Sequence, residues 1–156
     1  MKHLCALLLA TLFLAAMAAT APAMQHDHGG HGQPAASGHG GHQEMIMLDA
    51  VVQDGVRAVA HLNDVRAAMA QAGMKETHHF MIFFEEAGSG KKITTGTAAL
   101  KITGPDRKET GPVALVGMEG HFGADIVLGG KGRYSFTVGS RLADGKTRQF
   151  EFVLNR

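Results

Sequence analysis

Short segments of alternating apolar and polar residues, separated by Gly-rich turns, restrict the fold of this chain more than any other feature. Phe136 and Val138 alternate with polar residues in one segment, Phe150 and Phe152 in the next, and Asp144-Gly145 lies between them. A period of two places the apolar side chains on one face of a strand. About eight such segments at regular spacing predict an all-β fold, an antiparallel β-sandwich of about 7–8 strands.

The predicted strands and one helix can be placed along the chain. The segment 77–85 is apolar on both faces, which predicts a central strand. A helix at about 64–72 carries an apolar stripe that includes Met69, and it is too short to be stable alone, so we expect it to dock on the sheets with Met69 in the core. The predicted strands are 45–52, 56–62, 77–85, 93–103, 108–116, 121–128, 133–142 and 147–154.

The first predicted hairpin determines which side chains meet across its two strands. Gln53-Asp54-Gly55 is a turn sequence between two alternating segments. If Val52 pairs with Val56, Met47 lies directly opposite His61 on the face that carries the polar residues. We therefore expect a thioether and an imidazole side by side on that face.

The N-terminal region has the features of an export signal. Lys2 precedes an apolar run, and Ala21-Pro22-Ala23 fits the small-residue rule for cleavage. Residues 1–23 are therefore predicted to be a signal peptide, which makes the mature protein periplasmic or secreted. Cys5, the single cysteine, lies within this segment. The mature chain then has neither a disulfide nor a thiolate ligand.

Composition excludes several classes of function. Of 15 Lys and Arg residues, Lys2 lies in the predicted signal peptide, so the remaining 14 balance the 14 Asp and Glu residues. Without a basic patch or an aromatic platform we expect no nucleic-acid partner. The sequence contains no hydrolase or phosphate-binding motif, so we expect neither an enzyme nor a small-molecule substrate.

Residues 24–43 form a His- and Gly-rich segment, and we expect the folded domain to occupy 44–156. The segment cannot bury enough apolar surface to fold, so a flexible tail is predicted. Its imidazoles would bind Cu(II), Ni(II) or Zn(II) with little selectivity. Cleavage after Ala23 would also place His26 third from a free amine, an arrangement that suits square-planar Cu(II) or Ni(II). The histidines of the tail are His26, His28, His31, His39 and His42.

The segment 117–126, GMEGHFGADI, holds the candidate ligands of the folded domain. Met118 and His121 lie three residues apart in a Gly-rich turn that leads into an alternating strand. Thioether sulfur selects Cu(I) and imidazole accepts Cu(I) or Cu(II), so this pair favours copper. On the central strand His79 and Met81 share one face and are the expected partners, whereas His78 lies on the other face and is either a ligand or a satisfied buried histidine.

From residue 93 onward the pattern resembles the YtkA-like and FixH-like families of small periplasmic Ig-like domains. The resemblance is carried by TTGTAALKITGP, by GHFGADIVLGGKGRYSFTV and by the final hairpin at Asp144-Gly145. GHFGADI is also similar to a segment of Ig-like periplasmic iron-transport proteins, in which a Met and a His beside such a turn help to bind copper or iron. The resemblance implies an Ig-like β-sandwich and, for Met118 and His121, a role as metal ligands.

Two functions follow from these observations. The first is a periplasmic metal-binding protein, a copper chaperone, carrier or buffer that exchanges its ion with an envelope or membrane protein. Copper, as Cu(I) or Cu(II), is the expected ion, with nickel, zinc or iron as alternatives. The second is a non-catalytic Ig-like interaction module that docks on a membrane or envelope complex. The candidate ligands of the folded domain are Met47, His61, His78, His79, Met81, Met118 and His121.

Overall fold

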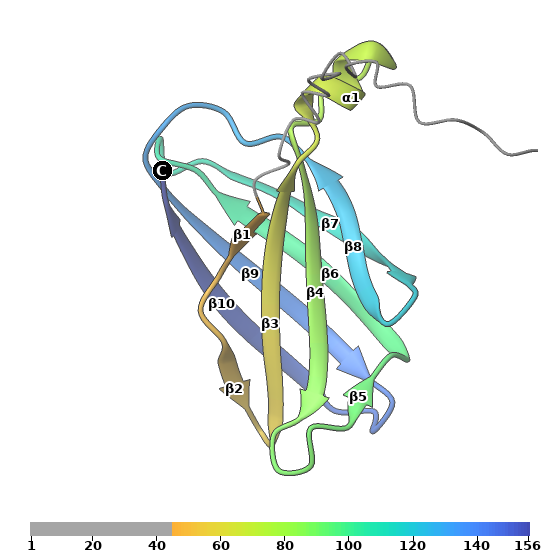
Figure 1. Cartoon of the computed structure of the whole chain (residues 1–156). Helices are drawn as coiled ribbons and strands as arrows, with labels where there is room; N and C mark the ends of the chain where they lie inside the picture. The colour runs from red at the N-terminus through yellow and green to blue at the C-terminus, as the bar shows by residue number, and fades with distance from the viewer. Residues whose placement is uncertain (1–44) are drawn as a thin grey trace, which may run out of the picture. The chain divides into compact units, whose positions relative to one another are not determined.

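A computed structural model describes residues 45–156, and the predictions for the signal peptide and the His-rich tail lie outside these residues. The described part contains ten strands and one short helix (Figure 1). No helix within it is long and apolar enough to cross a membrane. The elements are β1 Met45–Met47, β2 Val51–Gln53, β3 Val56–Asp64, α1 Arg66–Gln71, β4 His78–Glu86, β5 Lys92–Ile93, β6 Gly96–Thr103, β7 Glu109–Met118, β8 His121–Ile126, β9 Arg133–Leu142 and β10 Thr147–Asn155.

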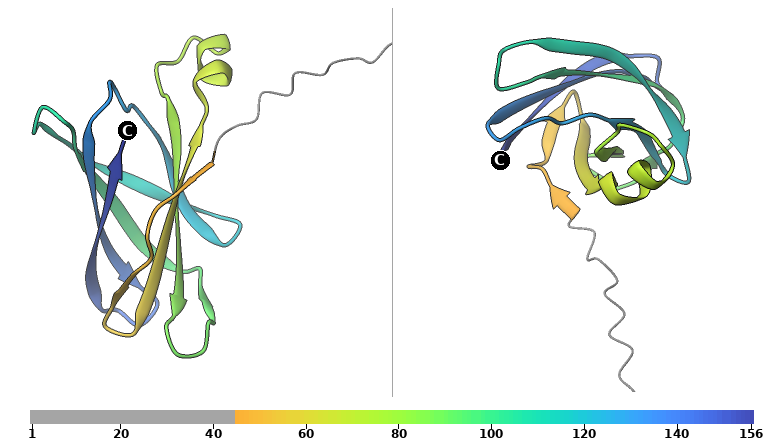
Figure 2. Two further views of the ribbon diagram at one scale, coloured as in Figure 1. Left: turned by 60° about the vertical axis from the view of Figure 1, so that its left-hand side comes forward. Right: turned by 90° about the horizontal axis from the view of Figure 1, so that it is seen from above.

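The strands form one curled antiparallel sheet that folds over into two facing layers (Figure 2). The order along the sheet is β1-β3-β4-β8-β7-β6-β9-β10, and β2 and β5 pair with β3 and β4 at the sides. We call the layer of β1 to β5 and β8 the front sheet, and the layer of β6, β7, β9 and β10 the back sheet. The predicted all-β, antiparallel fold with one short inserted helix is confirmed.

The central strand β4 places one face in the core and the other on the surface. His78, Phe80, Ile82 and Phe84 are buried, and the residues between them are more exposed. Phe80 stacks on Phe136 of β9 with ring centroids 5.6 Å apart. Phe84 contacts Phe150 of β10 at 5.4 Å. These aromatic contacts join the two layers, and β4 is central as predicted because β3 and β8 flank it.

Strand β7 passes from the back sheet to the front sheet. Its first part pairs with β6 up to Leu115, and Val116 to Met118 pair with β8. The register with β6 shifts between Leu100 and Ile102, and such a bulge increases the local bend and twist of a strand. Gly111 lies at this irregularity with φ +103°, where a Cβ would be 2.6 Å from the carbonyl oxygen of Leu100. The bend brings Met118 beside β8.

The predicted strand 45–52 is divided in two, and the two parts have different registers. Met47 lies opposite His61, as expected, but Val52 pairs with Arg57 and not with Val56. The predicted pairing of Val52 was therefore wrong. The chain does not pair with β3 between β1 and β2. When β2 pairs with β3, its register is shifted by one residue relative to that of β1. A one-residue shift reverses the faces, so Val52 is exposed, against the prediction that it points inward.

Helix α1 does not dock on the sheets as expected. None of its residues is buried, and Met69 is half-exposed and not in the core. The helix lies at one end of the strands, where the Asp64 carboxylate accepts a hydrogen bond from the backbone N–H of Arg66 at 3.0 Å (Figure 1). This local bond and the ion pair of the two side chains hold the first turn, so the helix forms without covering the core.

A buried arginine connects the layers at the opposite end. The Arg148 guanidinium of β10 donates two hydrogen bonds to the Asp144 carboxylate, at 3.0 and 2.6 Å, and one to the carbonyl oxygen of Asp54 at 3.3 Å. Asp54 belongs to the turn between β2 and β3, so the contact joins the outer strands of the two sheets. The hydrogen bonds from Arg148, and then from the Lys146 backbone, lower the pKa of Asp144 to about 2.

We predict that Phe84→Ala lowers the free energy of unfolding by about 3–5 kcal/mol, because it leaves a cavity between the layers. Val52→Ala, at an exposed strand position, is the control and should change the free energy by less than about 0.5 kcal/mol. Chemical denaturation measures both. Equal effects of the two substitutions would contradict the two-layer core.

Candidate metal centre

The outer face of the front sheet gathers three of the four histidines and four of the six methionines of residues 45–156. In β4 the outward positions are those between the buried residues, and the same alternation holds in β3. Directly paired residues of antiparallel strands point to the same side. The register therefore places one group of side chains on this face: Met45, Met47, His61, Asn63, His79, Met81, Phe83, Met118, His121 and Asp125.

One row of this face runs across four neighbouring strands. Met47 of β1 is opposite His61 of β3, His61 is opposite Met81 of β4, and Met81 is opposite Gly123 of β8. Neighbouring strands are about 4.8 Å apart. The row continues onto a fifth strand, β7, where Val116 is opposite Gly123. Apart from Val116, each side chain of the row is a thioether or an imidazole, and Gly123 leaves one position vacant.

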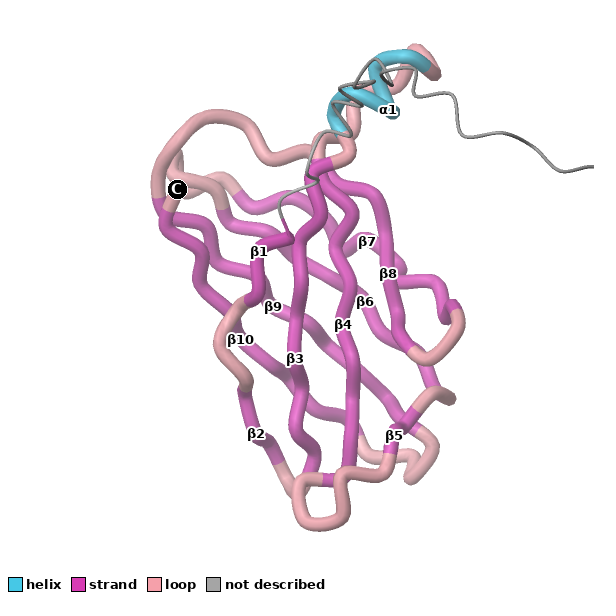
Figure 3. The backbone as a smooth tube through the Cα atoms, in the orientation of Figure 1, coloured by secondary structure: helices cyan, strands magenta, loops and turns pink. Residues whose placement is uncertain are grey.

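The predicted Met118–His121 pair is a cross-strand pair that closes the β7–β8 hairpin. The two residues are directly opposite, and Glu119-Gly120 forms the turn between them (Figure 3). Gly120 has φ +95°, a conformation that favours glycine. The hairpin therefore places the Met118 sulfur and the His121 imidazole on the same face.

The vacant position at Gly123 is the point where candidate ligands converge. A Cβ built on Gly123 would lie 2.9 Å from His79 Nε2 and 3.1 Å from the Met118 methyl carbon. His79 comes from β4 and Met118 from β7, so two side chains far apart in sequence meet over one glycine. Met81 is opposite Gly123 in the row, and the His121 ring is 6.2 Å from the His79 ring, centroid to centroid. A side chain at position 123 would occupy this space.

Asp125 orients the His79 ring. His79 Nδ1–H donates a hydrogen bond to Asp125 Oδ1 at 2.7 Å across the β4–β8 ladder. A carboxylate only accepts hydrogen bonds, so in the neutral ring the proton lies on Nδ1 and the lone pair on Nε2. Nε2 is the nitrogen that lies over Gly123. The same arrangement, in which a carboxylate fixes the ring through the other nitrogen, is typical of metal-binding histidines.

His61 and His121 contact the two sides of the Phe83 ring. Phe83 lies 5.1 Å from His61 and 5.3 Å from His121, centroid to centroid. Both histidines have a buried Nε2 that finds no hydrogen-bond partner within residues 45–156. Burial lowers the pKa of His61. Burial, and then the charge of His79, lower the pKa of His121 against an opposing effect of Glu119. Both rings are therefore held in the neutral form, which is the form that binds metals.

His78, the remaining predicted ligand of the domain, points into the core and away from this face. It is buried, and its Nδ1 lies 2.8 Å from Thr77 Oγ1. Thr77 Oγ1 in turn accepts a hydrogen bond from the backbone N–H of Leu128 at 2.8 Å. Burial lowers the pKa of His78, and Arg156 adds to this effect. The structure thus brings together His79, Met81, Met118 and His121, places Met47 and His61 farther along the row, and separates His78 from them.

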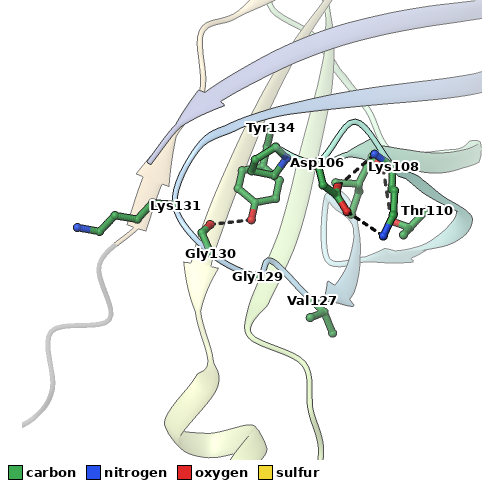
Figure 4. A pocket seen from close by; sticks show the side chains of 11 residues that line it. Asp106, Lys108, Thr110, Val127, Gly129, Gly130, Lys131 and Tyr134 are labelled. Carbon is green, nitrogen blue, oxygen red and sulfur yellow. Dashed lines mark hydrogen bonds and ion pairs between the residues drawn. The ribbon is translucent and has the colours of Figure 1, made fainter.

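Other parts of the described surface lack such a set of ligands. Residues 45–156 contain no group of three or more His, Cys, Asp or Glu side chains arranged to hold a metal, so a site here needs thioether ligands. A hollow of about 420 Å³ lies beside Tyr134, whose hydroxyl donates to the Gly130 carbonyl oxygen at 2.8 Å (Figure 4). Its charged residues Asp106 and Lys108 pair with each other, and Lys131 points away (Figure 4).

Comparison with known proteins identifies the fold and not the function. No protein-family model matches the chain, and no curated protein matches it. The structure is similar to the crystal structure of a DUF4426 family protein from Pseudomonas aeruginosa PAO1, with a TM-score of 0.52 and 12% sequence identity over 69% of this chain and 96% of that one. This likeness shows a small β-rich fold. The resemblance to the YtkA-like and FixH-like families is not confirmed.

We predict that thermal stability falls as the pH is lowered from about 7 to about 5. His61, His78 and His121 have a folded-state pKa below the ordinary value, so the unfolded chain binds more protons in this range. Protonation therefore favours unfolding as the pH falls. Thermal melts of the wild type and of His78→Gln at several pH values measure the slope. The variant should have a shallower slope, and an unchanged slope would show that His78 is not held neutral.

Proposed function

We propose that this protein is a periplasmic copper-binding protein, a chaperone, carrier or buffer, that holds Cu(I) with His79, Met81, Met118 and His121. The observation that carries the proposal is the convergence of His79 Nε2 and the Met118 side chain over Gly123. His121 and Met81 border the same space. Four potential ligands from three strands thus surround a position where the chain has no side chain.

The ligand types favour copper over the other ions. Thioether sulfur is a soft ligand that selects Cu(I), and imidazole suits copper as well. Structural zinc sites are built from Cys and His, and magnesium or calcium sites from oxygen ligands. Neither kind of ligand set is present among the described residues. Nickel, zinc and iron therefore fit less well here than copper.

Two features of the surroundings support reversible binding. Asp125 holds the His79 ring through Nδ1 and leaves Nε2 directed toward Gly123, so this ligand does not have to reorient when the ion enters. The site is also open to solvent, since Met118 is 37% exposed and the adjacent Val116 is 62% exposed. An envelope or membrane protein with its own ligands could approach from this side and take the ion by ligand exchange. Neither step requires a change in the oxidation state of copper.

The export signal and the His-rich tail complete this proposal. Cleavage after Ala23 would give a mature periplasmic or secreted protein whose first folded strand follows directly after five histidines. The tail would collect ions, and the folded domain would hold Cu(I) selectively. Membership of a YtkA-like or FixH-like Ig-like family belongs to this proposal as well.

A second candidate function is that of a non-catalytic interaction module. Val116 and Val127, both exposed, lie on or near β7 and β8, and an exposed apolar surface can form part of a docking interface. Copper affinity separates the two candidates, because a module with incidental histidines would bind Cu(I) no more tightly than micromolar.

We predict that His121→Ala and Met118→Leu each weaken Cu(I) binding by at least about tenfold, which is about 1.4 kcal/mol. Each removes one ligand, and Met118→Leu preserves the volume and apolar character of the side chain. Competition of the full chain against a Cu(I) chelator measures the affinity. Met74→Leu, at an exposed methionine between α1 and β4 and outside the strands that carry the site, is the control and should leave the affinity unchanged.

Gly123→Ala tests the same site by filling it. The new Cβ would displace His79 and Met118 and would also lie 3.0 Å from the backbone carbonyl oxygen of Phe80, so the affinity should fall at least about tenfold. Gly139→Ala on β9 is the matched control, because a Cβ there meets no atom within 4 Å. If His121→Ala and Met118→Leu both bind Cu(I) as tightly as the wild type, the proposed site is wrong.

A further inference from the structure

We propose that the outer face of the front sheet carries a second Cu(I) site, formed by Met47 of β1 and His61 of β3. This inference rests on the proposed copper function and adds a separate binding site to it. Met47 and His61 are directly opposite in the β1–β3 ladder, so their side chains lie on one face with Cβ atoms about 5 Å apart. A thioether and an imidazole at this separation can bind one soft ion between them.

Among the described residues, the imidazole of His61 has a ring nitrogen that lacks a hydrogen-bond partner. Its Nε2 is buried and has no hydrogen-bond partner within residues 45–156. Leaving a buried polar nitrogen unpaired is unfavourable, because it has lost its bond to water and gained no other. Coordination of an ion would relieve this cost. The neighbouring Met47 is 68% exposed and therefore contributes little to the core. Such exposure is unusual for a large apolar side chain. A sulfur so exposed is free to turn toward the His61 ring.

The Phe83 ring keeps this second site separate from the site over Gly123. It contacts His61 on one side and His121 on the other, and β4, which carries it, lies between β3 and β8. Phe83 thus contacts both rings, and the strand that carries it separates the strand of His61 from that of His121. Two neighbouring strand spacings, about 10 Å, separate the strand of His61 from the strand of Gly123. The face thus has room for two ions.

Met81 stands between the two sites. It is opposite His61 on one side and opposite Gly123 on the other. Methionine is unbranched and has three rotatable bonds, so its sulfur can turn toward either neighbour. In the chain, the five histidines of the tail come directly before Met45 and Met47. Along the row from β1 onward, the second site therefore comes before the site over Gly123.

Methyl NMR of the full chain tests the second site one methionine at a time. The protein is labelled with ¹³C at the methionine methyl groups and titrated with Cu(I) without oxygen, and single Met→Leu variants assign the signals. We expect the Met118 and Met81 signals to shift with the first ion and the Met47 signal to shift with a further ion. Met69 and Met74 are internal controls that should not move. Histidines of the tail carry no methyl group, so an ion bound only to them produces no methionine shift.

The His61→Ala variant gives the decisive comparison. It should abolish the shift of Met47 and preserve the shift of Met118, whereas His79→Ala should do the opposite. If Met118 and Met81 respond and Met47 does not, or if Met47 responds equally in His61→Ala, the second site is wrong and the proposed function stands. If the Met47 signal shifts only when His61 is present and the Met118 signal does not shift, the second site stands and the site over Gly123 is wrong. If none of the three signals shifts, both proposed sites are wrong.

Discussion

The pairing of β4 with β3 on one side and β8 on the other determines both the core and the candidate site. One register aligns Ile82 with Ala60 and Phe122 on the inner face, and Met81 with His61 and Gly123 on the outer face. Because side chains alternate along a strand, a shift by one residue would move every ligand into the core and every core residue to the surface. The aromatic contacts of Phe80 and Phe84 with the back sheet make such a shift costly. The stability of the core therefore holds the ligands in place.

Strand β7 contributes Met118, the one candidate ligand of the site over Gly123 that lies on neither β4 nor β8. It starts in the back sheet and reaches the front sheet only after the irregularity opposite Leu100 and Ile102. Met118 is its last residue, so its position depends on how far the strand has bent. The tight turn at Gly120 then sets Met118 opposite His121. The candidate site therefore combines the His79 imidazole, held on the central strand β4, with the more accessible Met118 thioether at the end of β7.

Strand alternation could be predicted from the sequence, and with it the faces of His78, His79 and Met81. The pairing of Met47 with His61 was also predicted, but from a register that holds for β1 and fails for β2. The break between these strands leaves no clear signal in the sequence, since the alternation of Ile46, Leu48 and Ala50 runs through it. The expected docking of α1 was wrong because an apolar stripe shows only that a helix can dock, and a partner surface must be present for it to do so.

Gly123 and Asp125 are residues of the candidate site that sequence reasoning missed. Both lie in the segment singled out for its Met and His, where the glycines were interpreted as part of a turn and Asp125 was given no role. Their roles depend on β4: Gly123 matters because His79 and Met118 meet over it, and Asp125 because it is opposite His79. Such cross-strand relations require the register of β4 with β8, which a single sequence does not provide. The signal that could have found them is the repeated spacing of two along His121, Gly123 and Asp125, which places all three on one face.

X-ray absorption at the copper edge tests the central claim most directly. After the predicted signal peptide the chain has no cysteine, so any sulfur bound to copper must come from methionine. For the mature full chain loaded with one equivalent of Cu(I), the account predicts both sulfur and nitrogen in the first coordination shell, and loss of sulfur when Met47, Met81 and Met118 are all replaced by Leu. A first shell of nitrogen alone in the wild type would place the ion on histidines only and would contradict the mixed site over Gly123.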